Sequence, residues 1–276
     1  MTAAATAFHP IPRDNGPFPF KYALDFYRDL GALTRHVYRR NGPVLKSGYG
    51  PLSVTALFGP EANQIVLQNR DDIFSSRQGW GFIIDHVFPG AIMSMDGEQH
   101  RYQRRIMNHA FKKPSLVSYL GHMNPHIDAG VRDWRASNRF LVFNSVKQLT
   151  LDLATRVFMG IELGEDADSI NHAFIDAVKA SIAPIRFSLP GTAYRRGVEG
   201  RATLVRMFNE LMPRKRAERS PDFFSEFCHT VTESGERYTD SEIVDHMAFL
   251  MMAAHDTTTS TLTTSVAGAL AVSLRR

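Results

Sequence analysis

The chain has 276 residues, of which 43% are hydrophobic and 22% charged, with a formal net charge of +4 at pH 7. This is an ordinary globular composition with enough apolar residues for a large core. The single cysteine excludes an intrachain disulfide and indicates a reducing compartment such as the cytoplasm. No apolar run approaches the length of a membrane span. Nucleic acid is not an expected partner, because the mild positive charge comes without a recognition helix or zinc-finger spacing.

The amino-terminal part of the sequence predicts a leader, a helix and a hairpin. Residues 1–20 are rich in Pro and Gly and are expected to be extended. Helical spacing over 22–42 stops at a Gly-Pro pair, which is a strong helix-end signal. Two short apolar runs, 43–50 and 52–59, then flank a Gly-rich turn and predict a β-hairpin. Pro60 suits the first position of the helix that follows.

The middle of the sequence predicts one long loop and then mostly helix. Residues 75–95 contain three glycines and isolated apolar residues, which is typical of a long functional loop with exposed hydrophobic side chains. A strand is expected at 140–145. Ser220 is the expected N-cap of a further helix, with Pro221 in its first turn.

The last predicted element is a long helix over 240–273. Thr239 with Glu242 three residues later fits a capping box at its start. At 1.5 Å per residue the helix would be roughly 50 Å long, more than twice the average. The sequence therefore predicts a mainly α fold with a small β element near the amino terminus.

A carboxylate followed by hydroxyls, Asp256 and Thr257, lies in the middle of this apolar helix. One interpretation is a polar side facing water, with threonine hydroxyls bonded to the carbonyl four residues back. The other is that the acid and the alcohol line a cavity, hold water and pass protons to a ligand. The small side chains of Ala253 and Ala254 would leave room for a flat ligand against the helix. Both interpretations stay open on these residues alone.

A second polar pair is His100 and Arg104, which are four residues apart and share one helix face. Two such donors suit a pair of carboxylates or a phosphate. The alternative is a solvated basic face, because the surrounding sequence is charged all round.

Together, the stretches MDGEQHRYQRRIMNHAF and DSEIVDHMAFLMMAAHDTT resemble the cytochrome P450 superfamily of haem-thiolate monooxygenases. The resemblance implies that His100 and Arg104 bind the haem propionates. It also implies that Ala253 lies against the haem and that Asp256 and Thr257 relay protons for oxygen activation. Ala254 stands where the family usually has Gly, which could change the local bend of the helix.

The resemblance covers essentially the whole chain and implies a single P450-like helical domain over 1–276, incomplete at its carboxyl end. The family's Glu-x-x-Arg helix and its cysteine-bearing haem loop lie downstream of the central helix. Cys228 lacks the Gly-rich loop of the iron ligand, so we expect a buried core residue there. The chain is thus expected to be a truncated form that is inactive alone, and no further metal site is predicted.

The complete enzyme that the resemblance implies would use haem b, O2 and electrons from a ferredoxin or flavoprotein donor to oxidise a small apolar organic substrate. Residues of the loop at 75–95 are candidate walls of the substrate pocket, with ordinary core packing as the alternative. These residues are Trp80, Phe82, Ile83, Val87 and Phe88. Four basic residues form a candidate docking face for the donor, with a solvated surface as the alternative: Arg101, Arg105, Lys112 and Lys113.

Two other classes of protein are alternatives to this resemblance. His255-Asp256 matches the dipeptide of metal-dependent phosphohydrolases, but residues 257–276 contain no acidic residue that would complete such a metal site. A non-catalytic helical binding protein derived from the same fold stays open as an alternative.

Overall fold

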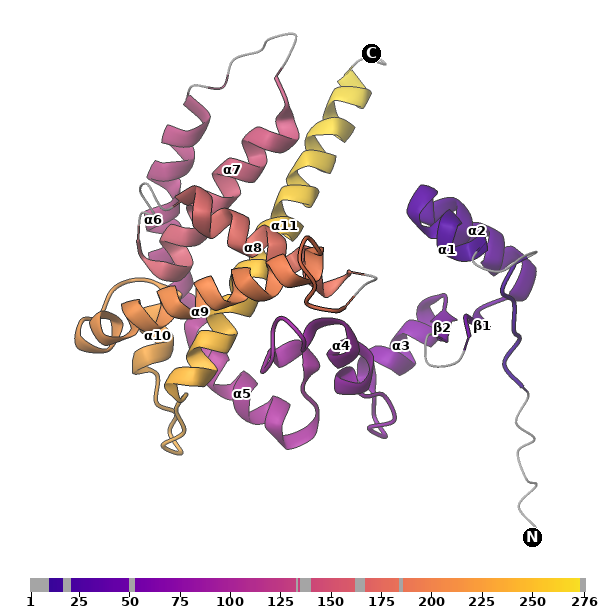
Figure 1. Cartoon of the computed structure of the whole chain (residues 1–276), viewed down its shortest axis with the longest axis horizontal. Coiled ribbons are helices and arrows are strands. Elements are labelled where there is room, and N and C mark those ends of the chain that lie inside the picture. Colours follow the sequence, from indigo (N-terminus) through magenta and orange to yellow (C-terminus); the bar gives the residue numbers. More distant parts are fainter. Residues whose placement is uncertain are drawn as a thin grey trace. The chain divides into compact units, whose positions relative to one another are not determined.

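The computed structural model describes residues 10–16, 21–49, 53–132, 134, 140–161, 167–183 and 186–273. The chain divides into two compact units, Met1–Phe74 and Ser75–Arg276 (Figure 1). Helices dominate the described part of both units, and the mainly α fold predicted from the sequence is confirmed. The predicted leader falls largely outside the described residues. No helix in the described ranges is long and apolar enough to cross a membrane.

The first unit contains three helices and the predicted hairpin. Its elements are α1 (Lys21–Arg28), α2 (Leu30–Asn41), β1 (Val44–Ser47), β2 (Val54–Leu57) and α3 (Pro60–Gln68). The two strands are antiparallel with Val44 opposite Leu57, which confirms the hairpin. The single helix predicted over 22–42 was wrong. Asp29 has an extended backbone there and its side chain accepts a hydrogen bond from the Ala32 amide, so it caps a second helix.

The regular elements described in the second unit are all helices or helical turns. Its elements are α4 (Ser76–Ile84), the 3₁₀ turn η2 (Ile92–Ser94), α5 (Gly97–Ala110), α6 (Lys113–Arg132), α7 (Val142–Ala154), the π-helical turn η3 (Thr155–Met159), α8 (Ala167–Ser181), α9 (Ala193–Ala217), α10 (Phe223–His229) and α11 (Asp240–Ser273).

Three local predictions for this unit were wrong. The loop at 75–95 contains α4, because Ser75 caps that helix and is itself held by Asp96. The strand predicted at 140–145 is the start of α7, whose apolar face is buried by tertiary contacts that outweigh local propensity. The N-cap of α10 is Asp222 rather than Ser220, since the Asp222 carboxylate accepts the Ser225 amide at 2.8 Å.

The long helix α11 has the predicted bounds, and its capping box is confirmed. The Thr239 hydroxyl accepts the Glu242 amide at 3.3 Å, and Glu242 accepts the Thr239 amide at 2.8 Å. In Figure 1, α11 runs through the second unit, and its contacts are chiefly with α7 and α9. Its amino-terminal half is buried, with Ile243 and Met247 fully inaccessible.

The helices α8 and α9 pack closely because glycine faces backbone at their contact. A Cβ atom on Gly197 would lie 2.6 Å from the Asp176 carbonyl oxygen, and one on Gly200 would lie 2.6 Å from that of Ala173. Both distances are far inside van der Waals contact. Small residues therefore let these two helices form one wall of the core, on which α11 also packs.

A buried polar network joins α5 to α11 inside this core. Gln103, 2% exposed, donates through Nε2 to the Glu242 carboxylate, and its Oε1 lies 2.8 Å from His246 Nε2. The amide orientation makes His246 Nε2 the donor. The Tyr238 hydroxyl donates to the Gln103 carbonyl. His246 is fully buried, and its Nδ1 has no hydrogen-bond partner among the described residues.

Burial lowers the pKa of His246 to about 4, only partly opposed by the nearby Glu242 carboxylate. The unfolded chain binds a proton near pH 6.5, so it holds more protons than the folded chain between pH 6.5 and 4. The contribution of His246 to the free energy of unfolding is therefore fully present above pH 6.5 and is lost as the pH is lowered from 6.5 to 4. In unfolding by urea, we expect the free energy of unfolding to drop by about 2 kcal/mol between pH 7 and pH 5 from this residue alone.

The His246→Gln variant should lose this part of the pH dependence, because glutamine does not titrate and its Nε2 can donate in place of the imidazole. His122→Gln, at an exposed position of α6, is the matched control and should leave the pH dependence as in the wild type. Equal pH dependence in wild type and His246→Gln would contradict the assignment.

Candidate functional site

The centre of α11 carries the predicted acid–alcohol pair on an exposed side. The Thr257 hydroxyl donates to the Ala253 carbonyl at 2.6 Å, and Thr261 and Ser265 repeat this bond at 2.9 Å, one and two turns further on. This is the backbone bonding anticipated from the sequence, and such bonds often bend helices. Thr257 thus uses its proton on the backbone, while its lone pairs stay available to accept from water.

Asp256 lies one residue earlier and faces a cation on the neighbouring helix. Its carboxylate is 3.7 Å from the ammonium group of Lys147 on α7, and its side chain is 43% exposed. A partly exposed carboxylate with a cation nearby stays accessible to water and can exchange protons with it. Ala253, one turn before Thr257, is half-buried and presents only a methyl group.

The other predicted pair lies on α5. His100 is half-buried and Arg104 is exposed, and neither forms an ion pair with any described residue. Their neighbours on the same helix differ. Arg101 pairs with Glu98 at 2.7 Å, and Arg105 pairs with Glu236 at 2.7 Å. Arg104 is therefore a cation that α5 presents without an internal carboxylate partner in the described ranges, which suits an anionic ligand.

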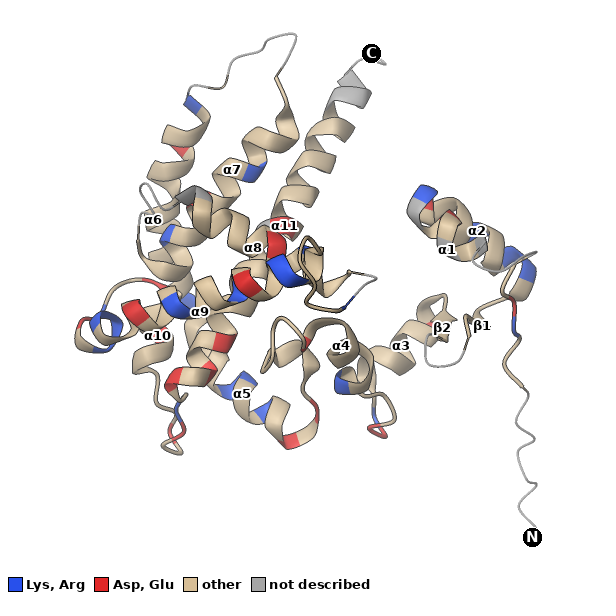
Figure 2. Ribbon diagram, viewed as in Figure 1, with Lys and Arg blue, Asp and Glu red and all other residues tan. Residues whose placement is uncertain are grey.

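Intramolecular ion pairs neutralise part of the positive charge of the candidate docking face. Arg101 and Arg105 each have an acidic partner, whereas Lys112 and Lys113 lie exposed at the turn between α5 and α6. Figure 2 shows basic (blue) segments along α5 and acidic (red) segments near the start of α11, which a hydrogen bond joins to α5. The net positive character of this face is thus smaller than the sequence alone indicates.

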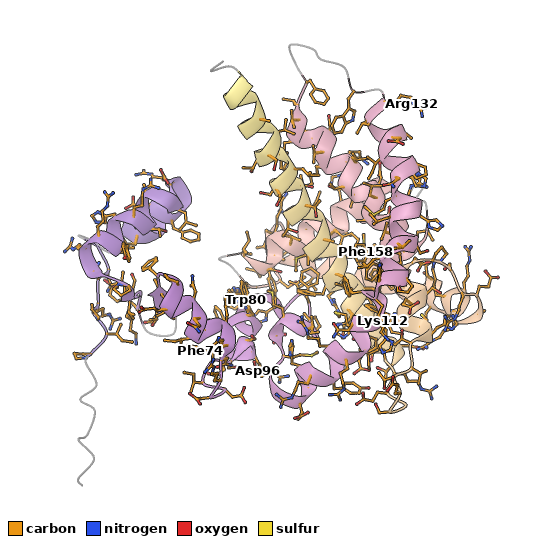
Figure 3. The ribbon with its side chains drawn as sticks, turned by 180° about the vertical axis from the view of Figure 1, so that it is seen from behind. Phe74, Trp80, Asp96, Lys112, Arg132 and Phe158 are labelled. Carbon is orange, nitrogen blue, oxygen red and sulfur yellow. The ribbon has the colours of Figure 1, made fainter. Side chains whose placement is uncertain are left out.

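The five candidate pocket residues separate into exposed and buried groups. Trp80, labelled in Figure 3, is 46% exposed on α4, and Phe82 on the same helix is 57% exposed. Ile83 packs partly against the core. Val87 and Phe88 are fully buried members of the hydrophobic core. The core-packing alternative describes the last two, whereas the first two are accessible to a ligand.

Phe82 is also held by a residue from the segment between α8 and α9. The Arg186 guanidinium stacks over the Phe82 ring at 4.4 Å and donates to the Phe82 carbonyl. Cation–π contacts of this kind contribute about 0.5–1 kcal/mol at exposed sites. The two segments are thereby linked at their surfaces.

An apolar cavity of about 420 Å³ lies on a different side of α11 from Thr257. Ala254 and Thr258 contribute its α11 wall, and successive helix residues differ by about 100° in direction. The rest is lined by α6 and α7, by Phe158 (Figure 3) and by Phe223. This cavity is not the space that Thr257 and Ala253 face.

The only cysteine of the sequence, Cys228, lies in the buried helix α10. Cys228 is 5% exposed in α10, and its sulfur lies 3.6 Å from that of Met212. Burial raises the pKa of its thiol to about 11, which keeps it protonated at neutral pH. The core role expected from the sequence fits this position. Within the described residues, no group of three or more His, Cys, Asp or Glu side chains could hold a metal ion.

The structure brings α5 and α11 together through residues that the sequence interpretation missed. Gln103 lies between the two predicted donors of α5, and His246 lies two turns before Ala253 on α11. A lone histidine in an otherwise apolar helical run was the available signal for His246. Nothing in the sequence marked Gln103, which stands within a run of charged residues. Lys147, the partner of Asp256, was not predicted either.

The chain was compared with known proteins. The family model for cytochrome P450 matches residues 12–270. A putative cytochrome P450 136 from Mycobacterium tuberculosis is 39% identical over 92% of the chain and 53% of its own length. A taxane 13-alpha-hydroxylase from Taxus cuspidata is 25% identical over 92% of the chain and 55% of its own length. The chain therefore spans about half the length of the curated relatives it matches.

The solved structures show the same fold. A retinoic acid-bound cyanobacterial CYP120A1 superimposes with a TM-score of 0.75 at 22% identity, over 91% of this chain and 58% of that one. The haem domain of cytochrome P450DA gives a TM-score of 0.74 at 18% identity. With a family model that matches nearly its whole length and two P450 folds that superimpose on it, the chain belongs to the cytochrome P450 family.

Proposed function

We propose that these residues form part of a haem-dependent monooxygenase, an oxidoreductase that inserts one oxygen atom from O2 into an apolar organic substrate. The observation that carries the proposal is the Asp256–Thr257 pair in the middle of α11, beside the small Ala253. Both side chains are accessible to water, and an acid next to an alcohol can pass protons from water to a ligand.

The chemistry of this pair is proton delivery. Thr257 Oγ accepts from a water molecule while its own proton is held by the Ala253 carbonyl at 2.6 Å. Rotation of the hydroxyl would release that proton toward a ligand on the exposed side of α11. Asp256, partly exposed and 3.7 Å from Lys147, exchanges protons with bulk water and can recharge the site.

The donors on α5 fit the carboxylates of a haem group. His100 and Arg104 lie one helical turn apart and carry no ion pair with the described residues, so they can meet an anion without first breaking an internal contact. Bound haem b would supply the iron that activates O2. The residues described here contribute its anion contacts on α5, a small-residue surface at Ala253 and the proton pathway.

The described residues do not offer the cysteine thiolate that would hold the haem iron. Thiolate ligation needs an accessible, deprotonated cysteine, whereas Cys228 is buried and protonated. We therefore propose that residues 1–276 by themselves do not form a thiolate-ligated haem and are inactive alone. In the reduced, CO-bound state, this chain mixed with haem should show no thiolate-type Soret band. A thiolate-type band from residues 1–276 would contradict the proposal.

Trp80, Phe82 and Ile83 are the proposed contributors to the substrate pocket. Apolar pockets are lined by such side chains, and Trp80 and Phe82 are accessible on α4. Retinoic acid is named for the cyanobacterial structure and taxane for the hydroxylase from Taxus, so these two molecules are the first probes.

The proposed electron donor is a redox protein. A ferredoxin or a flavoprotein, reduced in turn by NAD(P)H, would supply electrons from the α5 side, where Lys112 and Lys113 are exposed. The cytoplasm is the proposed compartment, because a single cysteine suits reducing conditions.

The Phe82→Ala variant tests the pocket. In the full-length protein, we expect the absorption shift that retinoic acid or a taxane produces to need about thirtyfold more ligand, because about 2 kcal/mol of apolar contact is lost. Phe111→Ala, an exposed aromatic residue after α5, is the control. A shift with unchanged midpoint in Phe82→Ala would remove this residue from the pocket.

The Thr257→Ala variant tests proton delivery. In the full-length protein supplied with NAD(P)H and either a ferredoxin with its reductase or a flavoprotein reductase, product formation should fall about 100-fold, in line with the loss of one general acid. Thr261→Ala removes the same type of backbone bond one turn further on and should keep most of the activity.

The solvent isotope effect gives a second readout of this step. Product formation in D2O should slow more in the wild type than in Thr257→Ala if the hydroxyl moves the proton. Equal losses of activity in Thr257→Ala and Thr261→Ala would instead assign both residues to helix structure.

A further inference from the structure

The candidate residues on α11 share one face with the buried His246. Seven residues separate His246 from Ala253 and eleven separate it from Thr257, which corresponds to directions within about 20° of that of His246. Along the helix axis, Ala253 lies about 10 Å and Thr257 about 16 Å beyond His246. A contact at His246 therefore fixes the direction of the stripe that carries both residues.

The candidate residues on α5 are placed in the same way relative to Gln103. His100 lies about 60° and Arg104 about 100° to one side of the Gln103 direction around the helix. Gln103 itself is 2% exposed, and the next residues on its buried face, Ile106, Met107 and Ala110, pack into the core. Rotation of α5 about its axis would move His100 and Arg104 together.

We propose that Gln103 and His246 are positioning residues whose hydrogen bond holds α5 and α11 at one rotational and axial setting, so that the His100–Arg104 pair and the Ala253–Thr257 stripe face the same ligand space. The functional meaning of this setting rests on the proposed haem function. The contact itself is a property of the described residues and can be tested without haem.

The hydrogen bonds of this network restrict how α5 and α11 can move relative to each other. Apolar contacts between helices tolerate sliding and rotation because they have no direction, whereas a hydrogen bond fixes both distance and angle. The Gln103 amide uses Nε2 on Glu242 and Oε1 on His246, so it contacts two successive turns of α11. The Tyr238 hydroxyl holds the backbone of Gln103 as well. Any slip of α5 would leave several buried polar atoms without partners.

The test measures the geometry between the two candidate sites. Spin labels at Arg104→Cys and Thr257→Cys, both exposed positions, report the distance between α5 and α11 by pulsed dipolar spectroscopy, on a Cys228→Ala background of the full chain. We expect a narrow distance distribution in this background. Gln103→Met keeps the side-chain length but removes both hydrogen bonds, and the distribution should broaden about twofold.

Two variants of His246 separate positioning from general stability. His246→Gln keeps a donor near the Nε2 position and should preserve the narrow distribution, whereas His246→Leu should broaden it. This pair keeps the test decisive if Gln103→Met fails to fold. Thr150→Val is the matched control, because it removes another buried hydrogen bond on α11, that between Thr150 and Thr259 at 2.7 Å. It should lower the urea midpoint without broadening the distribution.

The proposal is overturned if Gln103→Met and His246→Leu keep the narrow distribution, or if Thr150→Val broadens it equally. Neither outcome depends on haem. Absence of a haem spectrum in the full-length protein, together with broadening in Gln103→Met, would refute the proposed function and leave the positioning role intact.

Discussion

Burial of the amino-terminal half of α11 is the constraint on which the second unit depends. Ile243 and Met247 have no accessible surface, and α7, α9 and α10 pack around this helix. Burying a large apolar side chain contributes about 1.5–3 kcal/mol, so many such residues anchor the helix firmly. The polar residues within the buried half must then be satisfied internally, and Gln103 supplies the partner that His246 needs.

The carboxyl-terminal half of α11 is largely exposed to solvent. From Thr257 onward most described residues are exposed, and they include hydroxyl side chains in place of charges. Each hydroxyl at every fourth position bonds to the carbonyl one turn back, so the helix can carry polar side chains without losing backbone hydrogen bonds. The transition from buried to exposed character falls at Ala253–Thr257, which is where a ligand can reach the helix.

Much of this arrangement follows from local sequence. The capping box at Thr239 and Glu242, the hairpin and the bounds of α11 were all predicted, because each depends on residues close in the chain. The strand predicted at 140–145 failed since its apolar residues serve helix α7 instead, and only contacts with α11 decide between the two. Pairings over more than 100 residues, such as Gln103 with His246, leave no local pattern to detect.

The candidate site shows the same division. Thr257 and Arg104 are predicted site residues because each belongs to a short motif, whereas their mutual placement depends on the contacts between α5 and α11. A sequence motif shows which side chains are present, whereas the buried hydrogen bonds of Gln103 determine where α5 places them relative to α11. If α5 were free to rotate about its axis, the side chains of His100 and Arg104 would point in many directions. Ligand binding would then be weaker by the entropic cost of fixing that rotation. The Gln103–His246 bond removes that freedom before any ligand arrives, which is the physical advantage of a buried, directional contact between the two helices.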